Sequence, residues 1–274
     1  LAVDKAKKVL YFHNDPLSMN GSKNSDERLL LLNQCSSIVF NSEWSKKRFL
    51  TGLSEIYKKS PKLIVIQQST QVQKIDLKKK KNIITFVGKL NKAKGYDVFG
   101  SAILDILNKY NNWKAVVIGD EEREKHNFKH KNLNVLGFQN HSKVLEIFKQ
   151  TSISVVCSRW EEPFGRTSLE AASCGCAVVI TNRGGLPETI TNGVIVEKLS
   201  KKNVFNAISS LIANKKNRVE LQDLSLKNFS LTNKHASLLI DAYRDDVIKN
   251  MSVVIKKRLK ILHVTNFNER HNGR

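Results

Sequence analysis

The sequence lacks any apolar run long enough to cross a membrane, which argues against a protein built on transmembrane helices. A membrane-spanning helix needs about 20 consecutive apolar residues, and no stretch of the chain approaches that length. Residues 1–8 also lack the apolar core and the small-residue cleavage site of a secretion signal. We therefore expect a cytoplasmic protein.

Cysteines and acidic residues are scarce. The four cysteines, Cys35, Cys157, Cys174 and Cys176, form no CxxC pair and have no His-rich spacing beside them. Zinc sites need such spacings, so we interpret these cysteines as small, reduced core residues. The 25 acidic residues are outnumbered by 46 Lys and Arg, which gives a formal net charge of +21. This excess favours contact with a polyanion: a membrane surface, phosphates or nucleic acid.

Short runs of β-branched and aromatic residues alternate with amphipathic segments of helical length. Apolar strands separated by helices are typical of parallel sheets that are covered on both faces. We therefore predict an α/β fold of doubly wound, Rossmann-like parallel sheets. The predicted strands are Val9–His13, Ser37–Phe40, Lys62–Ile66, Asn82–Gly88, Trp113–Gly119, Leu133–Phe138, Ile153–Cys157 and Ala177–Thr181.

A polar stretch at residues 71–81 interrupts this alternation and predicts a linker between two sheets. It separates a first domain, residues 1–70, from a second domain, residues 82–230. Residues 231–258 have the apolar spacing of a terminal helix. The division into two domains fits the length of 274 residues, because one domain usually takes about 100 to 200.

The segment SRWEEPFGRTSLEAASCGCAVVITNRGGLPETI, residues 158–190, carries the most informative pattern. A predicted strand leads into an acidic loop with Glu162, and a helix is predicted to begin near Gly165. Open α/β sheets bind ligands at such strand-to-helix edges. The backbone N–H groups of Gly165, Arg166 and Thr167 would point out of the helix start, where the helix dipole favours negative charge. The segment therefore predicts a phosphate-binding site.

Glu162 and Glu170 stand eight positions apart, one in the loop and one in the helix. The spacing lets one carboxylate face a reacting group while the other reaches a hydroxyl farther along the same ligand; a solvated helix start is the alternative. The pair resembles the E-x7-E motif of the retaining glycosyltransferases of family 4, which adopt the two-domain GT-B fold. The resemblance implies that Glu162 is catalytic at the reacting sugar, that Glu170 binds the nucleotide ribose, and that the 165–167 backbone holds the diphosphate.

A second segment, FVGKLNKAKGYDVF at residues 86–99, is similar to the family's FVGRL-x-x-x-KG phosphate-binding stretch. The similarity implies that Gly88, Lys89 and Lys94 bind the donor, where the lysines would neutralise the charge that builds on the diphosphate. Lys89 stands where the family usually has Arg, so a point charge replaces a bidentate fork. Ordinary surface charge is the alternative for each lysine. Because two cations and a helix start can replace a magnesium ion, and no DxD triplet occurs, we expect no cofactor and no essential metal.

The first domain resembles the later part of the family's acceptor domain. In YFHNDPLSMNGS, residues 11–22, His13 would stand at a strand end facing the cleft, and it is a catalytic candidate, although a lone His is more often structural. The first strands of such a domain are missing, so we expect a fragment. Residues 259–274 look like the opening strand and acceptor loop of such a domain. Either they start a second, truncated module, which we favour because only one strand is present, or they complete the first sheet as a circular permutation would.

These resemblances imply a metal-independent, retaining glycosyltransferase of polysaccharide or lipopolysaccharide biosynthesis. It would move a sugar from a nucleoside-diphosphate sugar to a glycan or a lipid-linked acceptor, and its positive charge would favour peripheral contact with anionic lipid at the inner face of the membrane. The alternatives are a non-catalytic nucleotide-sugar-binding module or inactive fragment, and a nucleic-acid-binding protein. We disfavour nucleic acid as a partner because the basic residues lack the aromatic interleaving and the modules of such proteins.

Overall fold

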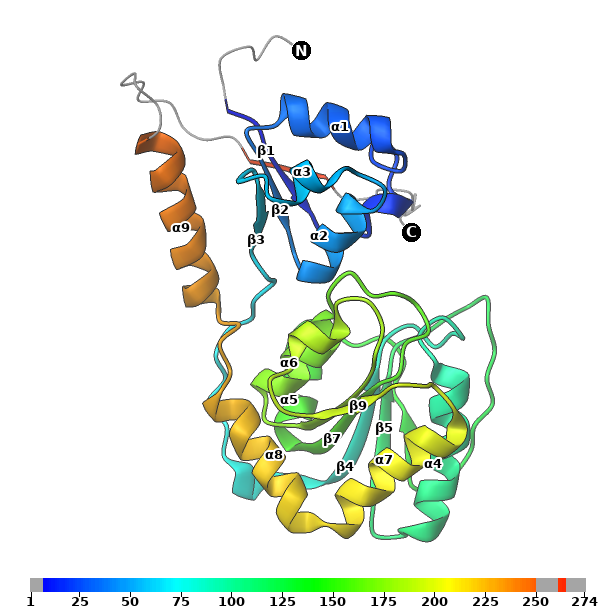
Figure 1. Ribbon diagram of the computed structural model, residues 1–274. Coiled ribbons are helices and arrows are strands. Elements are labelled where there is room, and N and C mark those ends of the chain that lie inside the picture. The colour runs from blue at the N-terminus through cyan, green and yellow to red at the C-terminus, as the bar shows by residue number, and fades with distance from the viewer. Residues whose placement is uncertain (1–6, 250–260, 265–274) are drawn as a thin grey trace. The chain divides into compact units, whose positions relative to one another are not determined.

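The computed structural model describes residues 7–249 and 261–264, and Figure 1 shows its helices and strands. The described residues divide into two compact units. The first contains the residues up to Gln68 together with those from Lys234 onward, and the second contains Ser69–Asn233. Each unit is built on a parallel β-sheet with helices beside it. The predicted α/β class is therefore confirmed.

The sheet of the second unit has the strand order β6-β5-β4-β7-β8-β9. The chain begins in the middle at β4, moves outward to β6, returns to β7 beside β4 and then moves outward in the other direction. This is the doubly wound arrangement, whose ligands bind at the carboxyl ends of the strands where the direction changes. That place lies at the ends of β4 and β7. The strands are β4 (Lys81–Val87), β5 (Lys114–Ile118), β6 (Leu133–Val135), β7 (Thr151–Val156), β8 (Ala177–Thr181) and β9 (Val194–Val196).

Helices cover both faces of this sheet. They are α4 (Tyr96–Lys109), α5 (His141–Gln150), α6 (Arg166–Ser173), α7 (Lys201–Ala213) and α8 (Lys215–Lys227), with short 3-10 helices η2 (Leu77–Lys79) and η3 (Leu186–Thr189). Along β8, Ala177 and Val179 pack into the core with α4 and α7, whereas Val178 and Ile180 pack into the core with α5 and α6. Successive strand residues point to opposite faces, and this explains why the strand sequence is apolar throughout.

The sheet of the first unit has the order β10-β1-β2-β3. On one face the rings of Phe12, Phe40 and Phe49 pack together with centroids 5.3 to 5.6 Å apart. On the other face Tyr243 of α9 packs against a smaller apolar group that includes Val39. The elements are β1 (Val9–Phe12), β2 (Ser37–Phe40), β3 (Leu63–Val65), β10 (Ile261–Val264), η1 (Pro16–Ser18), α1 (Ser25–Gln34), α2 (Glu43–Leu50), α3 (Glu55–Lys58) and α9 (Asn233–Lys249).

All eight predicted strands occur, and each boundary lies within three residues of the prediction. The short edge strand β9 was not predicted. The predicted linker 71–81 contains η2, and β4 already begins at Lys81. The predicted terminal helix 231–258 is helical over Asn233–Lys249, and its residues 250–258 lie outside the described part of the chain. The four cysteines are buried and unbridged, as we expected.

The segment 259–274 requires a correction. Its four described residues, Ile261–Val264, pair in parallel with Val9–Phe12 of β1 and occupy one edge of the first sheet. A strand edge presents unpaired backbone N–H and C=O groups, and a further strand satisfies them. The pairing contradicts the interpretation that we favoured, a separate second module, and agrees with the alternative in which this segment completes the first sheet. The predicted acceptor loop, within residues 265–274, lies outside the described residues.

Candidate functional site

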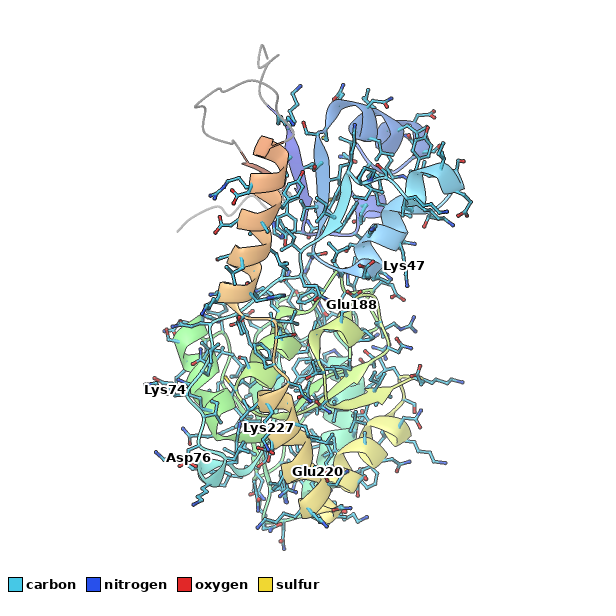
Figure 2. All side chains as sticks on the ribbon, turned by 60° about the vertical axis from the view of Figure 1, so that its left-hand side comes forward. Lys47, Lys74, Asp76, Glu188, Glu220 and Lys227 are labelled. Carbon is cyan, nitrogen blue, oxygen red and sulfur yellow. The ribbon has the colours of Figure 1, made fainter. Side chains whose placement is uncertain are left out.

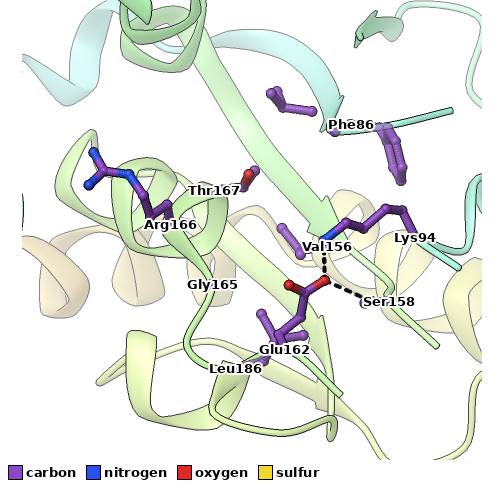
Figure 3. Close-up of a pocket in the computed structure, with 11 residues that line it drawn as sticks. Phe86, Lys94, Val156, Ser158, Glu162, Gly165, Arg166, Thr167 and Leu186 are labelled. Carbon is purple, nitrogen blue, oxygen red and sulfur yellow. Dashed lines mark hydrogen bonds and ion pairs between the residues drawn. The ribbon is translucent and has the colours of Figure 1, made fainter. Parts of the chain in front are cut away.

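A pocket opens at the carboxyl ends of β4 and β7, where the doubly wound sheet changes direction (Figure 3). All of the residues that line it belong to the second unit. Its walls come from the end of β4, the end of β7, the loop after β7 and the start of α6. The lining residues are Phe86, Val87, Gly88, Lys94, Val156, Ser158, Glu162, Gly165, Arg166, Thr167 and Leu186.

The start of α6 presents backbone N–H groups without a capping side chain. The helix begins at Arg166, and no side-chain oxygen caps its first turn. The first N–H groups of a helix have no acceptor within the helix, and the dipole makes this end favourable for an anion. By contrast α5, α7 and α8 of the same unit are capped by the side chains of Asn140, Ser200 and Asn214. The start of α4, after Gly95, has no capping side chain either, but Gly165, Arg166 and Thr167 at the start of α6 all line the pocket.

Gly165 makes this open start possible. Its φ angle is +122°, in the region that favours glycine. A Cβ atom at this position would also lie 2.5 Å from Cδ2 of Leu186, which is fully buried. The sequence therefore needs glycine here both for backbone conformation and for space.

Glu162 is held by two partners inside the pocket. Its Oε1 accepts a hydrogen bond from Nζ of Lys94 at 2.5 Å and another from Oγ of the buried Ser158 at 2.9 Å (Figure 3). The Glu162 side chain is only 12% exposed. Among the described residues its other oxygen, Oε2, has no hydrogen-bond partner. The carboxylate is thus fixed through one oxygen and can accept from a ligand through the other.

The loop that carries Glu162 is clamped from two sides. Gly185 N donates to the carbonyl oxygen of Glu162 at 2.6 Å. A Cβ at Gly184 would lie 2.1 Å from the same oxygen, so the turn must be glycine to pack this closely. On the other side Arg159 forms a bidentate pair with Asp97 of α4, at 2.6 and 2.7 Å. Burial would raise the pKa of Asp97, but the hydrogen bonds and charge of Arg159 bring that pKa below its ordinary value.

Glu170 lies one turn into α6 and is also held through one oxygen. Its Oε1 accepts from Nη2 of Arg166 at 2.8 Å and contacts Nε2 of His141 at 3.1 Å. The Glu170 side chain is 8% exposed, whereas those of Arg166 and His141 are 58% exposed. Glu170 is not among the residues that line the pocket.

The structure brings together six of the nine site residues that the sequence suggests: Gly88, Lys94, Glu162, Gly165, Arg166 and Thr167. Lys89 is exposed and does not line the pocket, and Glu170 does not line it either. His13 belongs to the first unit, where its ring lies 4.3 Å from that of Tyr11. The roles of all nine residues stay predictions.

Sequence reasoning missed Ser158 as a pocket residue. Its hydroxyl joins Glu162 to the loop before α4, because it also contacts the carbonyl oxygen of Ala93 at 3.2 Å. The position directly after a predicted strand end was a usable signal. Within the described residues there is no group of three or more His, Cys, Asp and Glu side chains placed to hold a metal ion. Nor does any helix described here combine the length and apolar character needed to span a bilayer.

A doubly wound sheet with a lysine, a buried glutamate and an uncapped helix start at its switch point has the features of a Rossmann-like domain that binds a phosphorylated ligand. The family described as glycosyl transferases group 1 matches residues 67–227. This match covers more than half of the 274 residues. The chain belongs to this family.

The chain is also similar to curated proteins, one of which is named as an N-acetylglucosaminetransferase. Spore coat protein SA of Bacillus subtilis is 29% identical over 159 residues, which are 52% of this chain and 42% of that protein. The lipopolysaccharide 1,2-N-acetylglucosaminetransferase of Salmonella typhimurium is 23% identical over 180 residues, 59% of this chain and 46% of that protein. The chain thus spans less than half of the length of either relative.

The crystal structure of HepE from Anabaena in complex with UDP and glucose has a TM-score of 0.70 to this chain. The two share 16% sequence identity over 89% of this chain and 72% of HepE. At this identity the likeness concerns the fold alone. The α/β fold with its parallel sheets therefore matches that of the GT-B glycosyltransferases.

Proposed function

We propose that this chain contains the donor-binding site of a glycosyltransferase that moves a sugar from a nucleoside-diphosphate sugar to a glycan or a lipid-linked acceptor. The observation that carries the proposal is the pocket in which Lys94, Glu162 and the uncapped start of α6 meet. Membership of the group 1 family supports the reaction class. The UDP and glucose named with HepE support a nucleotide sugar as the ligand class.

In this proposal the diphosphate of the donor lies at the start of α6. The N–H groups of Arg166 and Thr167 would donate to its oxygens, and the helix dipole would favour its charge. Lys94 would shift part of its hydrogen bonding from Glu162 to the phosphate that leaves, where negative charge builds as the glycosidic bond breaks. These groups supply positive charge without a metal ion, so we propose that no metal is essential.

Glu162 would act on the sugar. Lys94 and Ser158 hold its Oε1, so Oε2 would accept a hydrogen bond from a hydroxyl of the transferred sugar. The acceptor hydroxyl would give its proton to the departing phosphate and attack the anomeric carbon from the same face. This route forms the new glycosidic bond as the sugar–phosphate bond breaks, and it retains the anomeric configuration. His13 would serve the acceptor side of the reaction.

The proposed acceptor class rests on the name of a relative, and the proposed location rests on the charge of the chain. The name of the Salmonella relative suggests a lipopolysaccharide-type acceptor. Charged side chains lie on the surface of both units, among them Lys47 and Lys74 (Figure 2), and the net charge is +21. We propose a cytoplasmic protein that contacts anionic lipid at the membrane. Flotation with vesicles of anionic lipid at low salt checks this, and an absence of binding there would remove it.

The donor site is tested by calorimetric titration with UDP and with GDP in EDTA. We expect one of the two nucleotides to bind without metal, and Lys94→Ala to weaken that binding by about tenfold to 100-fold, because a charge-assisted hydrogen bond to phosphate is lost. Lys92→Ala is the matched control, since Lys92 is exposed in the same loop but does not line the pocket. Binding of neither nucleotide by the folded chain would reject the proposal, and an equal loss in both variants would reject the role of Lys94.

A further inference from the structure

Two side chains from different helices converge on a single oxygen of Glu170. Arg166 stands one turn earlier on α6, and His141 is the first residue of α5. Both contact Oε1, at 2.8 and 3.1 Å. Sequence analysis did not point to His141, because nothing in the local sequence connects it with Glu170.

The arrangement leaves Oε2 of Glu170 available. No described residue donates a hydrogen bond to this oxygen. It is not enclosed by the protein, so a ligand can reach it. A carboxylate held by one hydrogen bond can still turn about its side-chain bonds, whereas the contact of His141 from α5, added to the hydrogen bond from Arg166 within α6, restricts that rotation. The result is a largely buried carboxylate whose accessible oxygen has a defined direction.

The contacts of Arg166 and His141 with Glu170 contribute too little to folding stability to explain this arrangement. Arg166 and His141 are each 58% exposed, and ion pairs with exposed partners contribute little to folding. Burial of the Glu170 carboxylate to 8% exposure costs desolvation energy that such partners offset only in part. The cluster also adjoins the pocket, because Arg166 is itself a lining residue.

We propose that His141 is a positioning residue for the ribose of the donor. Together with Arg166 it holds Oε1 of Glu170, so that Oε2 accepts hydrogen bonds from the vicinal ribose hydroxyls. The inference rests on the proposed function and on the ribose role that the family resemblance implies for Glu170, and it deepens that function by naming the residue that orients the Glu170 carboxylate. A site built to accept a hydroxyl discriminates strongly against an analogue that lacks it.

The test is calorimetric titration of the chain with UDP and with 2′,3′-dideoxy-UDP, or with the guanine pair if GDP binds more tightly. We expect the unmodified chain to prefer the ribonucleotide by about tenfold or more. His141→Ala should reduce this preference at least about threefold and leave the dideoxynucleotide affinity nearly unchanged, because only the ribose contact is disturbed. His141→Gln should restore the preference, since its amide N–H can donate to Oε1. Lys143→Ala, an exposed neighbour on α5, should behave like the unmodified chain.

The outcomes separate the inference from the function on which it rests. An unchanged preference in His141→Ala overturns the role of His141 and leaves the donor site standing. Equal affinity of the unmodified chain for both nucleotides overturns the ribose contact of Glu170, and with it the inference. Binding of neither nucleotide overturns the proposed function itself. If His141→Ala melts early, His141→Phe, which fills the space but cannot donate, replaces it.

Discussion

The helices after β2 and after β7 begin in opposite ways, although each follows a parallel strand through a loop. In the first unit Ser42 caps α2, with its Oγ accepting from the backbone N of Ser45 at 2.9 Å. In the second unit α6 follows Gly165 and has no capping side chain. A capping oxygen occupies the place in which an anion would bind. At the start of α2 the capping oxygen therefore occupies the anion position, whereas at the start of α6 that position is available to a ligand.

The largest expected effect comes from closing the open start with a side chain. Gly165→Ala places a Cβ in a region of positive φ and within 2.5 Å of Leu186. We expect a loss of about 2 to 4 kcal/mol in the free energy of unfolding and the loss of nucleotide binding. Urea denaturation and calorimetry measure the two effects.

Gly52→Ala is the control for that change. Gly52 also has a positive φ, +75°, but a Cβ there meets no atom within 4 Å. Its cost should be limited to backbone strain of about 1 kcal/mol, with nucleotide affinity unchanged. If Gly165→Ala lowers the free energy of unfolding and the nucleotide affinity no more than Gly52→Ala does, the proposed role of Gly165 at the start of α6 is rejected.

A smaller effect is expected at the closed start. Ser42→Ala removes the cap of α2 and should lower the free energy of unfolding by about 1 kcal/mol. Nucleotide affinity should not change, because Ser42 is in the first unit and the pocket is lined by the second alone. Urea denaturation followed by nucleotide titration checks both statements. A change of nucleotide affinity in Ser42→Ala would show that the cap of α2 influences binding at the start of α6.

The smallest effect concerns two buried thiols of the second unit. Burial raises the pKa of Cys157, at the end of β7, and of Cys174, at the end of α6, to about 12. A thiol reacts as thiolate, so both should stay protonated and unreactive at pH 8. Ellman's reagent measures this on the folded chain. Rapid reaction of either thiol at pH 8 would contradict the burial of these side chains in the core.

The same comparison shows what the sequence can and cannot predict. Alternation of apolar runs with amphipathic segments located the strands most clearly where both faces are buried, as in β7 and β8. The local order of Glu162, Gly165 and Thr167 predicted their meeting, since a strand end, a loop and a helix start are adjacent in the chain. Lys89 and Lys94 both fit a phosphate-binding motif, but only Lys94 lines the pocket, because side-chain direction depends on the loop.

Contacts between distant segments could not be predicted. His141 reaches Glu170 only because α5 and α6 share one face of the sheet. Ile261–Val264 pairs with β1 from the other end of the chain, and a strand-like sequence does not state its partner. Such pairings depend on which edges and faces the tertiary fold leaves open.

The most direct test of the donor site is a crystal structure of the chain with UDP. The account predicts that the diphosphate lies at the start of α6, within hydrogen-bonding distance of the N–H groups of Arg166 and Thr167 and of Nζ of Lys94. UDP bound elsewhere on a folded chain, with Lys94 still paired to Glu162 and the start of α6 empty, would contradict it.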